Sequence, residues 1–197
     1  MKKAGFMKDA LILFVITLIS GVLLGGVYEM TAAVIAQRQE AEKQKTYKEV
    51  YADASSFSTN EELTAKAASA DLSAYEKVSV SEILDAKDAS GNVIGHLVTS
   101  TSKAGYGGEV TISIGITSDG TITGIGFLTI NETPGLGMKA KDDEFKNQFI
   151  GKNAPQLSLV KGGGAGDAEI NAISGATVTS TAVTNAVNAA LFLVSGN

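Results

Sequence analysis

The sequence predicts an α+β fold, with one apolar N-terminal helix followed by a domain in which helices flank an antiparallel sheet. Two observations lead to this prediction. Eighteen consecutive residues near the start of the chain, 10–27, carry no charge. Further on, four segments with strand character follow one another between residues 78 and 130, and helical patterns lie on both sides of them. A length of 197 residues without an internal repeat suits one such domain plus an appendage.

The uncharged run Ala10–Val27 reads ALILFVITLISGVLLGGV. At about 1.5 Å per residue, a helix of this length nearly crosses a hydrocarbon core of about 30 Å. Lys2, Lys3 and Lys8 precede the run, whereas the segment after it carries both signs of charge. By the positive-inside rule we expect residues 1–9 in the cytoplasm, a single transmembrane helix over 10–27 in contact with lipid, and an extracytoplasmic remainder in the cell membrane.

Two other interpretations of the run stay open. A cleaved signal peptide has a similar start, and Val34-Ile35-Ala36 offers a small-residue cleavage site, although it lies well past the apolar stretch. A buried core helix is the second alternative, but such a helix is usually apolar along one stripe rather than on every face. We favour a retained anchor because the apolar part of a signal peptide is usually only about 7–15 residues long.

Composition excludes several classes of protein. The chain has no Cys and a single His, so it cannot build iron–sulfur clusters, disulfides, thiol catalysts or sites with several histidines. The net charge of −5 argues against nucleic acid as a partner. The one histidine, His96, lies within an expected strand, where a structural role is the commoner one. With neither a nucleophile–base pair nor a metal cluster in the pattern, we expect no catalytic residue and no metal ligand.

We expect a helical stalk or linker over 28–60 and the globular domain over 61–197. The first part of this linker is rich in Ala, Gln, Glu and Lys and lacks Gly and Pro, which favours a helix. A short helix should follow from Glu61 to about Ala70, with Ser58 or Thr59 as its N-terminal cap.

The strands are predicted from alternation of apolar and polar residues with turn residues between them. Turn sequences at 88–92 and 118–120 separate the first and second pairs, and consecutive strands joined by short turns are most simply antiparallel. The four expected strands are Val78–Ala86, Val93–Thr101, Glu109–Thr117 and Thr121–Ile130.

Two helices are expected after the strands. The first covers Lys139–Ile150, with Phe145 and Phe149 spaced i, i+4 for contact with the core. The second covers Thr179–Val194 and is amphipathic. Between them, Lys161–Glu169 is predicted to be a flexible loop, and its glycines neither follow a clear strand nor open a clear helix, which excludes a dinucleotide-binding fold. The apolar stripe of the second helix consists of Ala182, Val183, Ala186, Val187, Ala190, Leu191 and Val194.

The segment that enters the last helix, residues 171–180, reads NAISGATVTS. Backbone N–H groups at a helix N-terminus bind anions, and a phosphate held there would be surrounded by four hydroxyl side chains. On the local pattern alone a simpler role is the commoner one, since Ser and Thr routinely cap helices. The four side chains are Ser174, Thr177, Thr179 and Ser180.

The tetrapeptide Ser174-Gly175-Ala176-Thr177 resembles the flavinylation motif of a family of FMN-binding domains. The RnfG subunit of the Rnf complex and the NqrC subunit of the sodium-pumping NADH:quinone reductase share this domain. In that family a flavin transferase joins FMN, through its phosphate, to the hydroxyl of the last Thr, which implies Thr177 here. One position departs from the family's motif: an acidic residue usually stands where this chain has Asn171.

A second segment resembles the family's ETPGLG loop, which lies near the flavin. Proline fixes φ, while the two glycines permit positive φ and close approach of the backbone to a flat ring. The loop 105–108 would also bring Tyr106 against the flavin, although core or surface packing is the commoner role of a Tyr. The loop residues are Glu132, Thr133, Pro134, Gly135, Leu136 and Gly137.

The resemblance covers nearly the whole chain, because anchor, strands, loop, short helix, motif and terminal helix come in the family's order. It implies a non-catalytic electron-carrier subunit of an Rnf-type complex, which moves electrons between ferredoxin and NAD and couples them to Na⁺ or H⁺ transport. It also implies covalent FMN, a flavin transferase for maturation and the other subunits of the complex as partners. The alternatives are the NqrC subunit of the quinone reductase and a membrane-tethered binding module without flavin.

Overall fold

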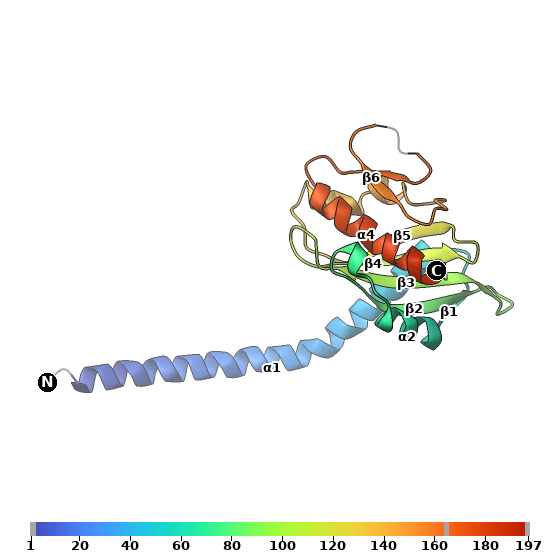
Figure 1. Ribbon diagram of the computed structural model, residues 1–197. Helices are drawn as coiled ribbons and strands as arrows, with labels where there is room; N and C mark the ends of the chain where they lie inside the picture. The colour runs from blue at the N-terminus through green and yellow to red at the C-terminus, as the bar shows by residue number, and fades with distance from the viewer. Residues whose placement is uncertain (1–2, 164–165, 196–197) are drawn as a thin grey trace. The chain divides into compact units, whose positions relative to one another are not determined.

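The computed structural model describes residues 3–163 and 166–195 and divides the chain into two compact units. The N-terminal unit is Met1–Glu42 and the globular unit is Lys43–Asn197. Helix α1 runs over Lys3–Val50, so its last two turns belong to the globular unit (Figure 1). The apolar part of α1 is long enough to cross a membrane and none of it is buried within the protein. The helical continuation expected after residue 27 is therefore confirmed.

The globular unit is built on a five-stranded antiparallel sheet in the order β1-β2-β3-β4-β5 (Figure 1). The four expected strands are confirmed. The first strand was not expected, because it is four residues long and its pairing partner lies far along the chain, with Ser56 opposite Lys87. The strands are β1 Ser56–Thr59, β2 Val78–Lys87, β3 Val93–Ser102, β4 Val110–Thr117 and β5 Ile122–Ile130.

Helix α2, Glu61–Ser69, begins where it was expected but has a different cap. The side chain of Asn60 accepts a hydrogen bond from the Leu63 N–H at 2.9 Å, so Asn60 is the N-cap. The predicted cap at Ser58 or Thr59 is wrong, because both residues pair with β2 within β1. A short 3₁₀ turn, η1, follows at 73–75.

The helix expected over 139–150 is broken into the 3₁₀ helix η2, Gly137–Lys141, and the single-turn helix α3, Asp143–Lys146. After α3 the backbone bonds tighten to the three-residue spacing of 3₁₀ turns, and Gly151, with φ of +77°, reverses the chain onto β5. The expected core contact is confirmed: Phe145 and Phe149 are buried with their ring centroids 5.5 Å apart.

The segment after α3 contains a small parallel sheet of β6, Ser158–Val160, and β7, Glu169–Asn171. The loop expected at 161–169 therefore ends where β7 begins. Within that loop, Gly164 and Ala165 lie outside the described residues.

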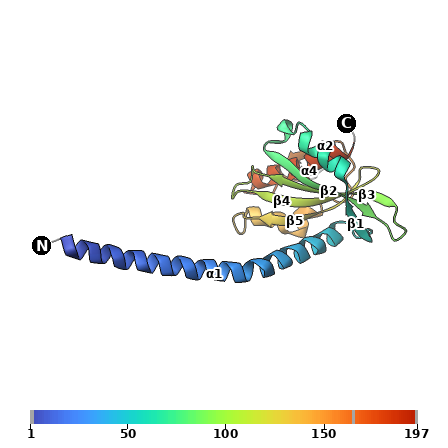
Figure 2. The same cartoon turned by 90° about the horizontal axis from the view of Figure 1, so that it is seen from below.

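Helix α4, Thr177–Val194, closes the fold and packs on one face of the main sheet. Figure 2 shows α2 and α4 on the same side of the strands. The predicted stripe is buried, apart from the half-buried Val194, and with two-thirds of the helix buried α4 is a core helix despite its apolar composition. Its buried polar side chain Asn188 bonds both the N–H and the carbonyl of Leu157, at 2.8 and 2.9 Å.

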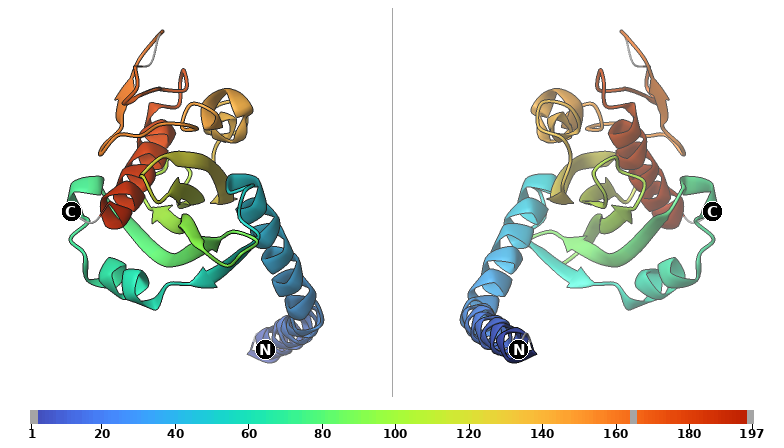
Figure 3. Two further views of the ribbon diagram at one scale, coloured as in Figure 1. Left: turned by 90° about the vertical axis from the view of Figure 1, so that its right-hand side faces the viewer. Right: turned by 90° about the vertical axis from the view of Figure 1, so that its left-hand side faces the viewer.

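The last turns of α1 cover the opposite face of the sheet (Figure 3). Tyr47, Val50 and Tyr51 are buried there, packed with Leu84 and Leu97 of β2 and β3. The globular unit therefore begins at residue 43, whereas the sequence pattern predicts a start at 61, because two aromatic rings of the expected stalk complete the core.

Candidate functional site

The two segments singled out in the sequence meet at one pocket of about 520 Å³. One wall is the loop that follows β5, and the other is the first turn of α4 with the residues just before it. The volume lies within the range of about 300–1,000 Å³ that is common for small-molecule sites. The lining residues are Tyr106, Glu132, Thr133, Leu136, Gly137, Gly175, Ala176, Thr177, Val178 and Thr179.

The two walls touch at Gly137. A Cβ atom built on Gly137 would lie 2.6 Å from the hydroxyl of Thr179 and 2.7 Å from a carboxyl oxygen of Glu132, both too close for any side chain. Glycine at this position therefore lets the loop backbone lie directly on the first turn of α4. The other loop glycine, Gly135, has a φ of +77° and provides the turn itself.

The N-terminus of α4 has no side-chain cap. Its N-cap residue is Ala176, and no described residue accepts a hydrogen bond from the N–H groups of residues 177–179. The hydroxyl of Thr177 makes no hydrogen bond within the described part of the chain either. The capping role considered from the sequence is thus not the one that the structure gives these side chains, and three N–H groups are left for an anion.

Ser174, Ser180, Pro134 and Gly135 do not line this pocket. The hydroxyl of Ser180 is fully buried, donates to the carbonyl of Ala176 and accepts from the N–H of Ile173, each at 3.0 Å. It therefore fixes the turn that precedes α4. Ser174 is exposed and lines a neighbouring hollow instead.

Glu132 is buried, with 7% of its surface exposed, yet only one of its carboxyl oxygens has a partner. Oε2 accepts a hydrogen bond from the N–H of Gly107 at 3.2 Å, whereas Oε1 has no partner among the described residues. Buried polar atoms are normally hydrogen-bonded, so an unpaired oxygen beside a pocket indicates a ligand that donates a hydrogen bond.

Three apolar side chains lie exposed around the same pocket: Tyr106, Leu136 and Val178, with 78%, 44% and 50% of their surfaces exposed. Such a cluster in a globular domain marks a binding surface. FMN fits these features, since it has a phosphate for the free N–H groups, a flat apolar ring, and N–H and hydroxyl donors for Glu132. Sequence reasoning named Tyr106 and missed Val178, whose place after the motif was its only signal.

Asn171, the position that departs from the family's motif, is held by Gln148, which the sequence did not single out. The Asn171 N–H donates to the Gln148 side-chain oxygen at 2.7 Å, and the Gln148 amide donates back to the Asn171 carbonyl at 3.3 Å. The side-chain oxygen of Asn171 is buried without a partner in the described structure.

Comparison with known proteins places the chain in a family. Residues 105–192 match the FMN-binding domain, and residues 1–50 match the RnfG N-terminal region. The G component of the Na⁺-translocating ferredoxin:NAD⁺ oxidoreductase complex of Acetobacterium woodii is 36% identical over 92% of this chain and 87% of its own length. The G component of the proton-translocating complex of Clostridium ljungdahlii is 33% identical, over 88% and 83%.

Among solved structures, NqrC of Shewanella oneidensis aligns with a TM-score of 0.48 and 21% identity, over 74% of this chain and 69% of that one. The near full-length similarity to the two ferredoxin:NAD⁺ oxidoreductase proteins, together with both matched regions, identifies the family: this chain belongs to the RnfG family of ion-translocating oxidoreductase complexes.

Proposed function

We propose that the protein is an electron-carrier subunit of a membrane-bound ion-translocating ferredoxin:NAD⁺ oxidoreductase and that it carries FMN in the pocket between the 132–137 loop and α4. The family and the FMN-binding domain support this role. The observation that carries the assignment of the site is the meeting of both motifs at one pocket, beside unpaired N–H groups and an unpaired buried carboxyl oxygen.

Thr177 would hold the cofactor covalently. Its hydroxyl lines the pocket at the free N-terminus of α4, where the helix dipole and the N–H groups of residues 177–179 favour a phosphate. A phosphoester bond would join this hydroxyl oxygen to the phosphorus of FMN. Forming that bond needs an activated flavin donor such as FAD and a transferase, which we propose as a maturation partner.

The remaining pocket residues would position the flavin. Bound FMN supplies the capacity to accept and release electrons, and the protein supplies its placement and environment. Leu136, Val178 and Tyr106 would shield the ring from water, while Glu132 would accept a hydrogen bond from an N–H or hydroxyl group.

The protein is a membrane subunit with an apolar N-terminal helix. We propose that this helix crosses the membrane once, with residues 1–9 in the cytoplasm and the globular unit outside, as the lysines at the N-terminus favour. A covalent bond suits that location, because FMN that dissociated outside the cell would be lost.

The test is mass spectrometry of the full chain co-expressed with a flavin transferase. No Lys or Arg follows Lys161, so trypsin releases one C-terminal peptide that contains all four candidate hydroxyls. Fragmentation of this peptide must assign the added mass of FMN to Thr177. A flavin on another residue would refute the attachment site, and a chain that takes up flavin neither covalently nor reversibly would refute the proposed cofactor.

A further inference from the structure

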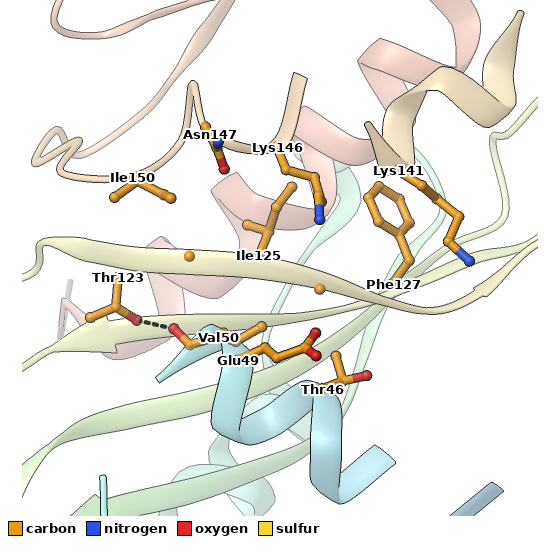
Figure 4. Close-up of a pocket in the computed structure, with 12 residues that line it drawn as sticks. Thr46, Glu49, Val50, Thr123, Ile125, Phe127, Lys141, Lys146, Asn147 and Ile150 are labelled. Carbon is orange, nitrogen blue, oxygen red and sulfur yellow. Dashed lines mark hydrogen bonds between the residues drawn. The ribbon is translucent and has the colours of Figure 1, made fainter. Parts of the chain in front are cut away.

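A second pocket, of about 290 Å³, lies along β5 and shares no residue with the flavin pocket. Figure 4 shows β5 crossing between the end of α1 and the segment 141–150, with the side chains of both directed toward the strand. The strand contributes residues 124–127, α1 contributes Thr46, Glu49 and Val50, and the other wall is formed mainly by Lys141, Lys146, Asn147 and Ile150.

Strand β5 is an edge of the main sheet. One side of it pairs with β4, and on the other side Ile122 bonds to the backbone of Gly151 and Lys152, at 2.8 and 2.9 Å. Beyond Ile122, no backbone–backbone hydrogen bond from the described residues reaches the outer side of the strand. This edge therefore presents unpaired backbone donors and acceptors to the pocket.

The edge also lacks the usual protection against pairing. Its nine residues, ITGIGFLTI, contain neither a charge nor a proline. Register shifts against β4 leave Thr123 and Leu128 as extra residues and keep Gly124–Phe127 in regular register between them. Gly124 and Gly126 lie under α1, and added Cβ atoms would approach the backbone or side chain of Val50. The helix thus covers the face of the strand and leaves its edge open.

The wall opposite α1 has a distinct chemistry. Lys141 forms no ion pair among the described residues, and Lys146 pairs at 3.2 Å with Asp143, a side chain that is 82% exposed. No carboxylate of that wall lines the pocket, although acidic residues outnumber basic ones in the chain as a whole. Ile150 adds an apolar side chain that is 53% exposed.

We propose that the outer edge of β5 at Gly124–Phe127 pairs with an extended segment of another subunit of the oxidoreductase complex. An acidic side chain of that segment faces Lys141 and Lys146, and an apolar one packs on Ile150. Pairing of an added strand satisfies the backbone groups, and the wall supplies the selectivity. A second copy of this chain is a poorer occupant, because β5 itself has no acidic residue to face the lysines. The identity of the partner rests on the proposed function.

The first test is hydrogen exchange of the assembled complex compared with the full chain purified alone in detergent. We expect the amides of the outer edge within 122–130 to exchange at least tenfold more slowly in the complex. Strand β1, at the opposite edge of the sheet, is the internal control and should change less. Equal exchange of β5 in the two samples would overturn the proposal.

The second test places a photo-crosslinking residue at Ile150, with Val93 as the matched control. Val93 has a similar exposure, 46% against 53%, and lies outside the pocket. Crosslinks from position 150 to another subunit, and none from position 93, support the docking site. Crosslinks from position 150 to a second copy of this chain, or to nothing, overturn it.

A third measurement separates this proposal from the proposed function. The double variant Lys141→Glu, Ile150→Glu should reduce recovery of the chain with the complex at least tenfold, while Val93→Glu should not. Flavin loading of Thr177 should be equal in both variants and the natural protein, because the two pockets are distinct. Normal recovery of the double variant refutes docking alone, whereas a natural chain that takes up no flavin and joins no complex refutes both.

Discussion

Glu132 and Gly107 join two loops that lie far apart in the sequence: Oε2 of Glu132 accepts the N–H of Gly107 at 3.2 Å. The bond ties the loop after β5 to the loop that carries Tyr106. A Cβ atom on Gly105 would lie 2.8 Å from the other carboxyl oxygen, so this second loop must be glycine-rich to surround the carboxyl group. Glu132 thus organises one end of the pocket while it keeps one oxygen for a ligand.

Replacing Glu132 by Gln should raise the midpoint potential of bound FMN, because a negative charge beside the flavin opposes the gain of electrons. The amide oxygen of Gln can still accept the Gly107 N–H, so the loop should stay in place. A tenfold change in the reduction equilibrium corresponds to about 59 mV for one electron or about 30 mV for two, and we expect a shift of this order.

Spectroelectrochemical titration of the flavin-loaded protein measures this shift. Glu109→Gln is the control, since Glu109 is largely exposed and pairs with Lys103 away from the pocket. A potential that is the same in both variants and in the natural protein would show that Glu132 acts on loop structure alone.

Thr177→Ala should give a folded protein without covalent flavin. The hydroxyl of Thr177 makes no hydrogen bond within the described structure, so its loss should cost less than about 1 kcal/mol of stability, the typical cost of removing a capping side chain. In-gel flavin fluorescence after denaturation measures loading, and thermal unfolding measures stability. Ser174→Ala should keep full fluorescence, because Ser174 is exposed and outside the pocket. Loss of flavin from the Ser174 variant alone would move the attachment site.

The sequence was sufficient for the parts of the fold that have a local signal. Alternation and turn residues predicted β2 to β5, and the apolar stripe predicted α4. Strand β1 escaped because four residues show too little periodicity, and because its pairing with β2 is a long-range contact. The globular boundary was misplaced because Tyr47 and Tyr51 continue a helix whose local pattern does not reveal that its end is buried.

The site was predictable only as far as its motifs reach. Both motifs were found, and Tyr106 was named beside them, but their meeting at Gly137 depends on how β5 and α4 pack. Ser180 illustrates the limit, since a hydroxyl next to a motif carries no sign of whether it faces a ligand or a backbone carbonyl. The two hydrogen bonds between Gln148 and Asn171 cross from one loop to another strand and leave no pattern in the sequence.

An alkaline phosphatase fused to the C-terminus should be active, because the N-terminal lysines favour a cytoplasmic start and one span places the globular unit outside. A fluorescent protein that matures only in the cytoplasm should stay dark at the same position. The opposite pair of results would reverse the orientation. The intact mass of the purified protein supplies the second check, since a chain that has lost its first 36 residues would have carried a processed signal peptide rather than an anchor.

Asn171→Asp should speed flavin loading without changing the attachment site. The side-chain oxygen of Asn171 is buried and unpaired, so a carboxylate there would lack a partner and loosen the docked segment. It would also offer the transferase a charge, and charge-assisted hydrogen bonds are roughly twice as strong as neutral ones. Both effects favour reaction at Thr177, and time courses of in-gel fluorescence with equal transferase and FAD measure the rates.

Gln148→Ala separates the two effects, because it frees the backbone of Asn171 from two hydrogen bonds without adding a charge. If recognition of charge dominates, as we expect, Gln148→Ala should load flavin at nearly the natural rate while Asn171→Asp loads faster. An equal acceleration in both variants would instead show that release of the segment limits loading. If Asn171→Asp and the natural protein load at the same rate, Asn171 is fully competent and the prediction is wrong. Full loading of the Asp variant with none of the natural protein would favour a flavin-free role for this chain.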